Sequence, residues 1–126
     1  MRILLARFAL DGHDRGIITI IDACKQAGME VIYVHFTDVE EVVVSAIEED
    51  VEMIGITSSM GEHEYIAVRI TETLQKRQAG IPLIMGGVIP TADVPKLLGM
   101  GVKRIFGPGT SPLEAVSFIF QILGKE

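Results

Sequence analysis

A histidine flanked by an acid and by glycines lies between the first apolar run of the chain and the first helical stripe. The segment reads Asp11-Gly12-His13-Asp14-Arg15-Gly16. A histidine that binds a metal usually donates its second ring N–H to a carboxylate, which fixes the tautomer, and Asp11 can be that carboxylate. Gly12 and Gly16 have no Cβ to hold a large flat ligand away from the backbone. The spacing predicts a metal-ligand loop, although an ordinary surface turn uses the same residue types.

The elements that must position this loop follow from the hydrophobic pattern, in which short apolar runs alternate with helical stripes. Near-continuous aliphatic strands are typical of a parallel sheet that helices cover on both faces. We therefore predict a single domain over residues 1–126 with an α/β fold, a flavodoxin-like (Rossmann-like) doubly wound sheet of five parallel strands in the order 2-1-3-4-5. The predicted strands are 2–6, 31–34, 53–57, 83–85 and 104–106.

Two helix starts carry capping signals. Thr37 with Glu40, and Ser111 with Glu114, have the spacing of capping boxes, and Pro112 suits the first helical position. The single cysteine, Cys24, falls on the apolar face of the first helix, so we expect a buried, unreactive thiol.

The loops after strands one, three, four and five meet at the carboxyl edge of such a sheet, where ligands bind. These loops are built almost entirely from small and hydroxylated residues, which leave a slot in which backbone N–H groups and hydroxyls can meet a polar ligand. Glycines follow strands in many α/β proteins, so the prediction rests on four such loops with a histidine at one corner. Besides 11–16, the loop segments are 57–63, 86–90 and 106–110.

The charge balance limits the partners. The chain has 11 basic and 17 acidic residues, a formal net charge of −6, and no basic cluster, which argues against nucleic acid and against an anionic membrane surface. No signal-like or membrane-length apolar segment is present, and one cysteine cannot form an internal disulfide, so we expect a cytoplasmic protein.

In these motifs the chain resembles the cobalamin-binding domain of the adenosylcobalamin-dependent acyl-CoA mutases, above all of the methylmalonyl-CoA mutase type. That family carries Asp-x-His-x-x-Gly, then Ser-x-Leu, then Gly-Gly. Here Asp11, His13 and Gly16 match the first part, Thr57-Ser58-Ser59 occupies the second, and Gly86-Gly87 completes the third. The departures are Thr57 in place of serine, which keeps a hydroxyl, and Ser59 in place of leucine.

The resemblance implies that the chain binds adenosylcobalamin in the base-off, His-on form. His13 would be the axial ligand of cobalt, with Asp11 hydrogen-bonded behind it, and the displaced nucleotide tail would lie in a slot between the sheet and its helices. A separate large catalytic mutase subunit would supply the substrate site, and the sequence leaves a homo-oligomer open. The implied cofactor-binding residues are Asp11, Gly12, His13, Gly16, Thr57, Ser58, Ser59, Gly86, Gly87, Gly107, Gly109 and Thr110.

The alternatives belong to other classes. The serious one is a corrinoid carrier for methyl transfer, which usually has a helical cap domain ahead of this fold, whereas this chain starts directly at strand one. A phosphoreceiver would need an aspartate ending strand three and a lysine ending strand five, near the places of Thr57 and Phe106. A flavodoxin would need a hydroxyl-rich phosphate loop after strand one, which residues 7–10 do not provide.

Two further expectations concern single side chains. We expect His63, in the first turn of the third helix, to be solvated rather than to border the cofactor. Valine at Gly86 or Gly87 is expected to block the nucleotide tail and to leave the fold intact, since the predicted site lies outside the core.

Overall fold

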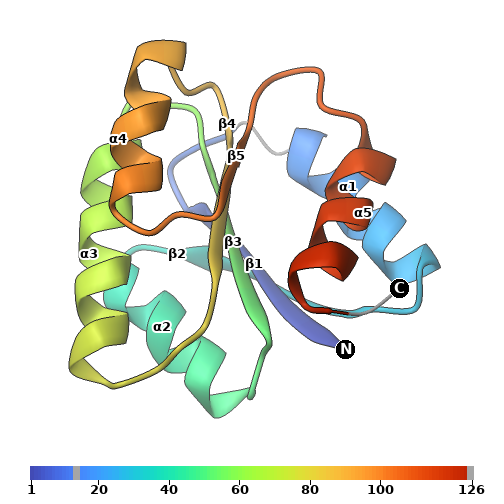
Figure 1. Ribbon diagram of the computed structural model, residues 1–126, viewed down its shortest axis with the longest axis horizontal. Helices are drawn as coiled ribbons and strands as arrows, with labels where there is room; N and C mark the ends of the chain where they lie inside the picture. Colours follow the sequence, from blue (N-terminus) through green and yellow to red (C-terminus); the bar gives the residue numbers. More distant parts are fainter. Residues whose placement is uncertain (13–14, 125–126) are drawn as a thin grey trace.

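The computed structural model describes residues 1–12 and 15–124, and it contains one parallel sheet of five strands. The strand order is β2-β1-β3-β4-β5, which confirms the predicted topology (Figure 1). Each strand begins where it was predicted or one residue earlier, and four of them run further toward the carboxyl edge. The strands are β1 (Arg2–Phe8), β2 (Glu30–Phe36), β3 (Met53–Ser58), β4 (Leu83–Gly87) and β5 (Arg104–Phe106).

Helices cover both faces of the sheet, as the aliphatic strands require. Two helices pack on one face and the others pack on the opposite face (Figure 1). The first layer is α1 (Arg15–Gln26) with α5 (Pro112–Ile122), and the second is α2 (Val39–Glu48), α3 (His63–Lys76), the short 3-10 helix η1 (Thr91–Asp93) and α4 (Val94–Gly99). Cys24 lies in the α1/α5 layer with no exposed surface, which confirms the predicted burial, and this burial raises the pKa of its thiol to about 11.

The two predicted capping boxes are wrong in detail. Helix α2 is capped by Asp38, not Thr37, because its carboxylate accepts a hydrogen bond from the Glu40 N–H at 3.0 Å, and Glu41 accepts from the Asp38 N–H in return. The shift by one residue buries Val39 in the first turn. Helix α5 begins at Pro112 as predicted, but the Ser111 side chain makes no capping hydrogen bond.

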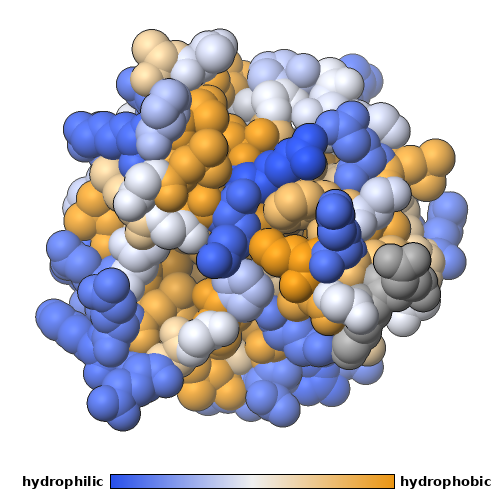
Figure 2. Space-filling view, viewed as in Figure 1, coloured by the Kyte–Doolittle hydropathy of each residue, from blue (hydrophilic) through white to orange (hydrophobic). Residues whose placement is uncertain are grey.

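Hydrophilic and hydrophobic side chains are unevenly distributed over the surface of the molecule. Figure 2 shows hydrophilic side chains along much of the margin of the face in view and also across its middle, with hydrophobic ones between them. Within residues 1–12 and 15–124, no helix combines the length and the apolar character needed to cross a bilayer.

Candidate functional site

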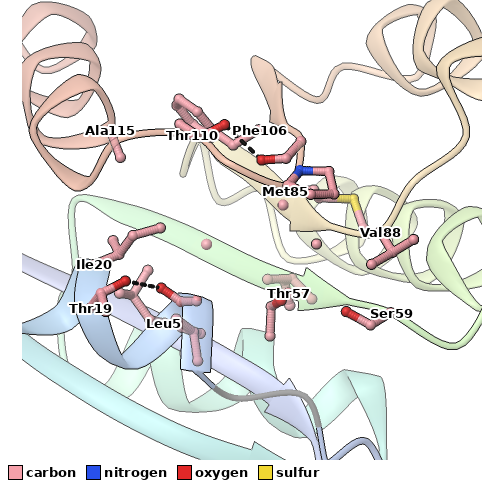
Figure 3. Close-up of a pocket in the computed structure, with 18 of the residues that line it drawn as sticks. Leu5, Thr19, Ile20, Thr57, Ser59, Met85, Val88, Phe106, Thr110 and Ala115 are labelled. Carbon is pink, nitrogen blue, oxygen red and sulfur yellow. Dashed lines mark hydrogen bonds between the residues drawn. The ribbon is translucent and has the colours of Figure 1, made fainter.

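A cavity of about 480 Å³ lies between the carboxyl half of the sheet and the helices α1 and α5 (Figure 3). It brings together most of the predicted site residues, from the loops after β1, β3, β4 and β5. Those that line it are Gly12, Gly16, Thr57, Ser59, Gly86, Gly87, Gly107, Gly109 and Thr110. The cavity therefore lies on the face of the sheet that α1 and α5 cover.

The floor of the cavity is made by two glycines on the face of the sheet that α1 and α5 cover. Gly55 lies between Leu5 and Ile84 in the strand register, and Gly86 lies between Thr57 and Phe106. A Cβ at Gly55 would come within 2.5 Å of Leu5 Cδ2, and one at Gly86 within 3.2 Å of the Phe106 carbonyl oxygen. The space exists because two neighbouring strands carry no side chain at these points.

Gly55 was not among the predicted site residues. A glycine inside an otherwise aliphatic strand is a known sign of close approach by a ligand or by another backbone, and this signal was present in the segment 53–58.

The walls of the cavity are mostly hydrocarbon, and they were also missed as site residues. Leu5 and Ile84 come from strands, Ile20 from α1, and Ala115 from the first turn of α5 (Figure 3). Ile20 belongs to the apolar face that packs α1 on the sheet, so its pattern is the same as that of an ordinary core residue. Periodicity alone could not separate a cavity wall from the core.

The hydroxyl residues divide by strand alternation, since successive side chains of a strand point to opposite faces. Thr57 and Ser59 line the cavity, whereas Ser58 has no exposed surface and donates its hydroxyl hydrogen to the Glu62 carboxylate at 2.9 Å. Ser58 is thus the member of the predicted hydroxyl segment that the fold does not bring to the cavity.

Asp11 joins the first loop to the third. Its side chain is fully buried, and Oδ2 accepts a hydrogen bond from the Ser59 N–H at 3.0 Å. Arg7 holds the same loop from the other side by donating to the carbonyl oxygens of Asp11 and, at 3.3 Å, of Phe8. His13, the predicted metal ligand, lies outside the described residues, so its contact with Asp11 stays a prediction.

The expectation of a solvated His63 is wrong. Its side chain is 7% exposed, and Nε2 lies 2.8 Å from Asp93 Oδ2, while Nδ1 has no hydrogen-bond partner. The residue begins α3, and its partner Asp93 belongs to the 3-10 helix η1. It does not line the cavity, which lies on the opposite face of the sheet.

The part of the chain that the structure describes has no group of three or more His, Cys, Asp or Glu side chains that could hold a metal ion. These residues therefore do not form a metal site made only of protein side chains. What they offer is an apolar slot whose mouth is bordered by hydroxyls, backbone groups and the loop that leads to residue 13.

Sequence comparison links the chain to corrinoid proteins. A family model described as "B12 binding domain" matches residues 1–117. The chain is 38% identical to the pivalyl-CoA mutase small subunit of Xanthobacter autotrophicus over 94% of this chain and 81% of that protein. It is 38% identical to the 2-hydroxyisobutanoyl-CoA mutase small subunit of Aquincola tertiaricarbonis, over 94% of this chain and 89% of that one.

A longer relative matches only in part. Methylmalonyl-CoA mutase of Cereibacter sphaeroides is 39% identical over 97% of this chain, but the match covers 18% of that protein. The region similar to this chain is therefore a small portion of the larger polypeptide.

Structural comparison shows the fold. A cobalamin-binding protein from Desulfitobacterium hafniense superposes with a TM-score of 0.79 at 20% identity, over 95% of this chain and 58% of that one. A response regulator from Desulfuromonas acetoxidans gives a TM-score of 0.74 at 19% identity, over 98% of this chain and 96% of that one. Proteins of different function share this architecture, so the fold alone does not choose among them.

Gly87, the last residue of β4, has no room for a side chain. Gly87 has a φ of +115°, and a Cβ there would lie 2.2 Å from the Ser58 carbonyl oxygen, so the expectation that Gly87 tolerates valine without harm to the fold is wrong. Even alanine at this position would strain the backbone.

We predict that Gly87→Ala lowers the free energy of unfolding by about 1–3 kcal/mol. Gly107→Ala is the matched control, because a Cβ at Gly107 meets no atom within 4 Å, and it should change stability by no more than about 0.5 kcal/mol. Urea denaturation followed by circular dichroism measures both. Equal midpoints for the two variants would show that Gly87 is not constrained by Ser58.

Proposed function

Since this chain belongs to the B12-binding domain family and is related to the small subunits of acyl-CoA mutases, we propose that it is the adenosylcobalamin-binding subunit of such a mutase. In this proposal the cofactor binds base-off, with His13 as the axial ligand of cobalt. When bound, adenosylcobalamin supplies radical chemistry for rearranging a carbon skeleton.

The observation that carries the proposal is the cavity with Gly55 and Gly86 as its floor. A corrinoid bound without its own base must place its nucleotide tail somewhere, and a slot under α1 and α5 fits that need. The slot opens at the carboxyl edge of the sheet, beside the loop that carries Asp11 and leads to His13. One cofactor molecule could therefore place its nucleotide tail in the slot and its cobalt near the loop that leads to His13.

The chain's own residues would hold and orient the cofactor. Asp11 is fixed by the Ser59 N–H and, through its carbonyl oxygen, by Arg7, so the start of the ligand loop is anchored before any ligand binds. A carboxylate held in this way behind His13 would fix the tautomer of the imidazole and make it a stronger ligand. Because the corrin ring supplies its own nitrogen ligands, a single protein ligand is enough.

A separate large subunit is the proposed partner. The relatives that match most of their own length are named as small subunits of mutases, and such names imply a second chain. We propose that this second chain contributes the acyl-CoA site and that the present chain contributes the cofactor.

We predict that Gly55→Val lowers the affinity for cobalamin roughly tenfold to hundredfold, since the added side chain takes space that the tail would fill, and overpacking the occupied cavity costs about 1–3 kcal/mol. Valine favours strands, and the atom it meets first is the flexible end of Leu5, which can turn toward the cavity, so the unfolding midpoint should not fall. Isothermal titration with cobalamin and with cobinamide, which lacks the nucleotide, measures the effect.

The control for this substitution is Gly80→Val, at a glycine that does not line the cavity and whose added Cβ meets no atom within 4 Å. Gly80→Val should bind both ligands like the unmodified chain, and Gly55→Val should retain its affinity for cobinamide. An equal loss of cobinamide and cobalamin binding in a folded Gly55→Val protein would refute the placement of the tail.

We also predict that the chain alone, loaded with adenosylcobalamin, does not isomerise acyl-CoA thioesters. Adding the proposed large mutase subunit should confer activity, and the rate should saturate at a fixed ratio of the two subunits. A coupled assay for thioester isomerisation measures this. Methyl transfer from the loaded chain to a methyltransferase, with no isomerisation in any mixture, would instead favour the corrinoid carrier.

A further inference from the structure

The segment 88–93, between β4 and α4, has one end at the cavity and the other on the opposite helical layer. Val88 lines the cavity at the same end as Ser59 (Figure 3), and its N–H donates to the Ser58 carbonyl oxygen at 3.1 Å. Asp93 ends the segment in η1, which lies beside α3 (Figure 1). The contact that holds Asp93 therefore also limits where the chain can place Val88.

The far end of the segment is held by His63, the first residue of α3. Its Nε2 lies 2.8 Å from Asp93 Oδ2, and its side chain is 7% exposed. A second link joins α3 to α4, because Lys96 Nζ lies 2.7 Å from Glu64 Oε1. Both side chains of that pair are exposed, and exposed ion pairs contribute little. The bond to the buried imidazole is thus the one that can fix the segment.

The contact between His63 and Asp93 also has features that lower stability. Nδ1 of His63 is buried with no hydrogen-bond partner among the described residues, and such a group is costly to leave unpaired. Asp93 stands at the N-cap of α4, but its side chain makes no capping hydrogen bond there. Apolar side chains of similar shape can replace a polar pair with little loss of stability. The pair therefore fits a role in position better than a role in stability.

The piece of chain that holds this segment also holds the loop that leads to His13. The Ser59 N–H donates to Asp11 Oδ2 at 3.0 Å. Residues 58–63 contain this donor, and they also contain both attachment points of the segment 88–93. Two loops that border the cavity are thus positioned relative to one short stretch of the chain.

We propose that His63 is a positioning residue for the cofactor, because by holding Asp93 it keeps Val88 and the rest of the segment 88–93 where bound cobalamin requires them. The inference rests on the proposed function, since it takes cobalamin to occupy the cavity. Without the bond the segment samples other positions, and only the fraction of molecules that has it in place binds at full strength. His63 acts through Asp93 and does not itself line the cavity.

Two substitutions at His63 test the proposal by isothermal titration of the full chain with cobalamin. His63→Leu removes the nitrogen and keeps an apolar side chain, whereas His63→Gln keeps an N–H at about the reach of Nε2. We expect His63→Leu to bind cobalamin roughly threefold to tenfold more weakly, the range that one hydrogen bond contributes. His63→Gln should bind like the unmodified chain. The urea midpoint of His63→Leu should not fall, because Asp93 is 41% exposed and water can replace its partner.

The same bond can be removed from the Asp93 side, which decides the question even where His63→Leu fails to fold. Asp93→Ala should weaken binding as much as His63→Leu, and the double variant should bind no more weakly than either, because both side chains act through one bond. Lys96→Gln, which removes the exposed pair with Glu64, is the matched control and should leave the affinity unchanged. Hydrogen exchange in residues 88–93 of the free protein should be faster in Asp93→Ala than in Lys96→Gln.

The outcomes separate the inference from the proposed function. Unchanged cobalamin affinity in folded His63→Leu and Asp93→Ala would overturn the inference and leave the proposed function standing, even if the urea midpoint fell. Losses that add in the double variant, or a loss in His63→Gln as large as in His63→Leu, would also overturn it, since the bond would then not be the cause. Absence of cobalamin binding by the unmodified chain would overturn the proposed function and the inference with it.

Discussion

The absence of side chains at Gly55 and Gly86 sets how the sheet meets the helices α1 and α5. Protein interiors are close-packed, and a gap in them leaves its lining without neighbours on one side. Here the gap persists because α1 and α5 rest on residues that lie beside the glycines, among them Ile3, Met53 and Phe106. A ligand that fills the gap gains contacts for which the fold has already been arranged, and it stabilises the domain by mass action.

The second feature that the site depends on is the bond between Asp11 and Ser59. It ties the loop after β1 to the loop after β3, and these two loops border the mouth of the cavity. Arg7 reinforces the arrangement from β1, where it also contacts the Tyr33 hydroxyl at 3.2 Å. The loop that leads to His13 therefore starts from a fixed point at the edge of the cavity. The proposed cobalt ligand and the proposed site of the nucleotide tail can then keep a constant position relative to each other.

The pattern of the sequence predicted the topology because buried parallel strands and amphipathic helices have distinct periods, and the strand order follows from that alternation. It also predicted the glycine and hydroxyl residues at the carboxyl edge. It missed Leu5, Ile20 and Ala115, because an apolar side chain that faces a ligand cannot be distinguished by type from one that faces the core. The period of two in β3 could have separated Ser58 from Thr57 and Ser59, and the glycine within that strand could have indicated the floor. The contact of His63 with Asp93 joins segments 30 residues apart, so no local pattern in the sequence predicts it.

The proposed role of His13 as the axial ligand of a base-off cobalamin can be tested by electron paramagnetic resonance of the bound cob(II)alamin. The chain is labelled uniformly with ¹⁵N and the cofactor is left unlabelled, so the superhyperfine splitting tells which molecule supplies the axial nitrogen. If His13 is the ligand, each three-line pattern seen with unlabelled protein becomes a two-line pattern, and His13→Ala, which keeps His35 and His63, abolishes it. A three-line pattern in the labelled protein would show that the cofactor keeps its own base, and a two-line pattern that survives in His13→Ala would place the ligand on another residue.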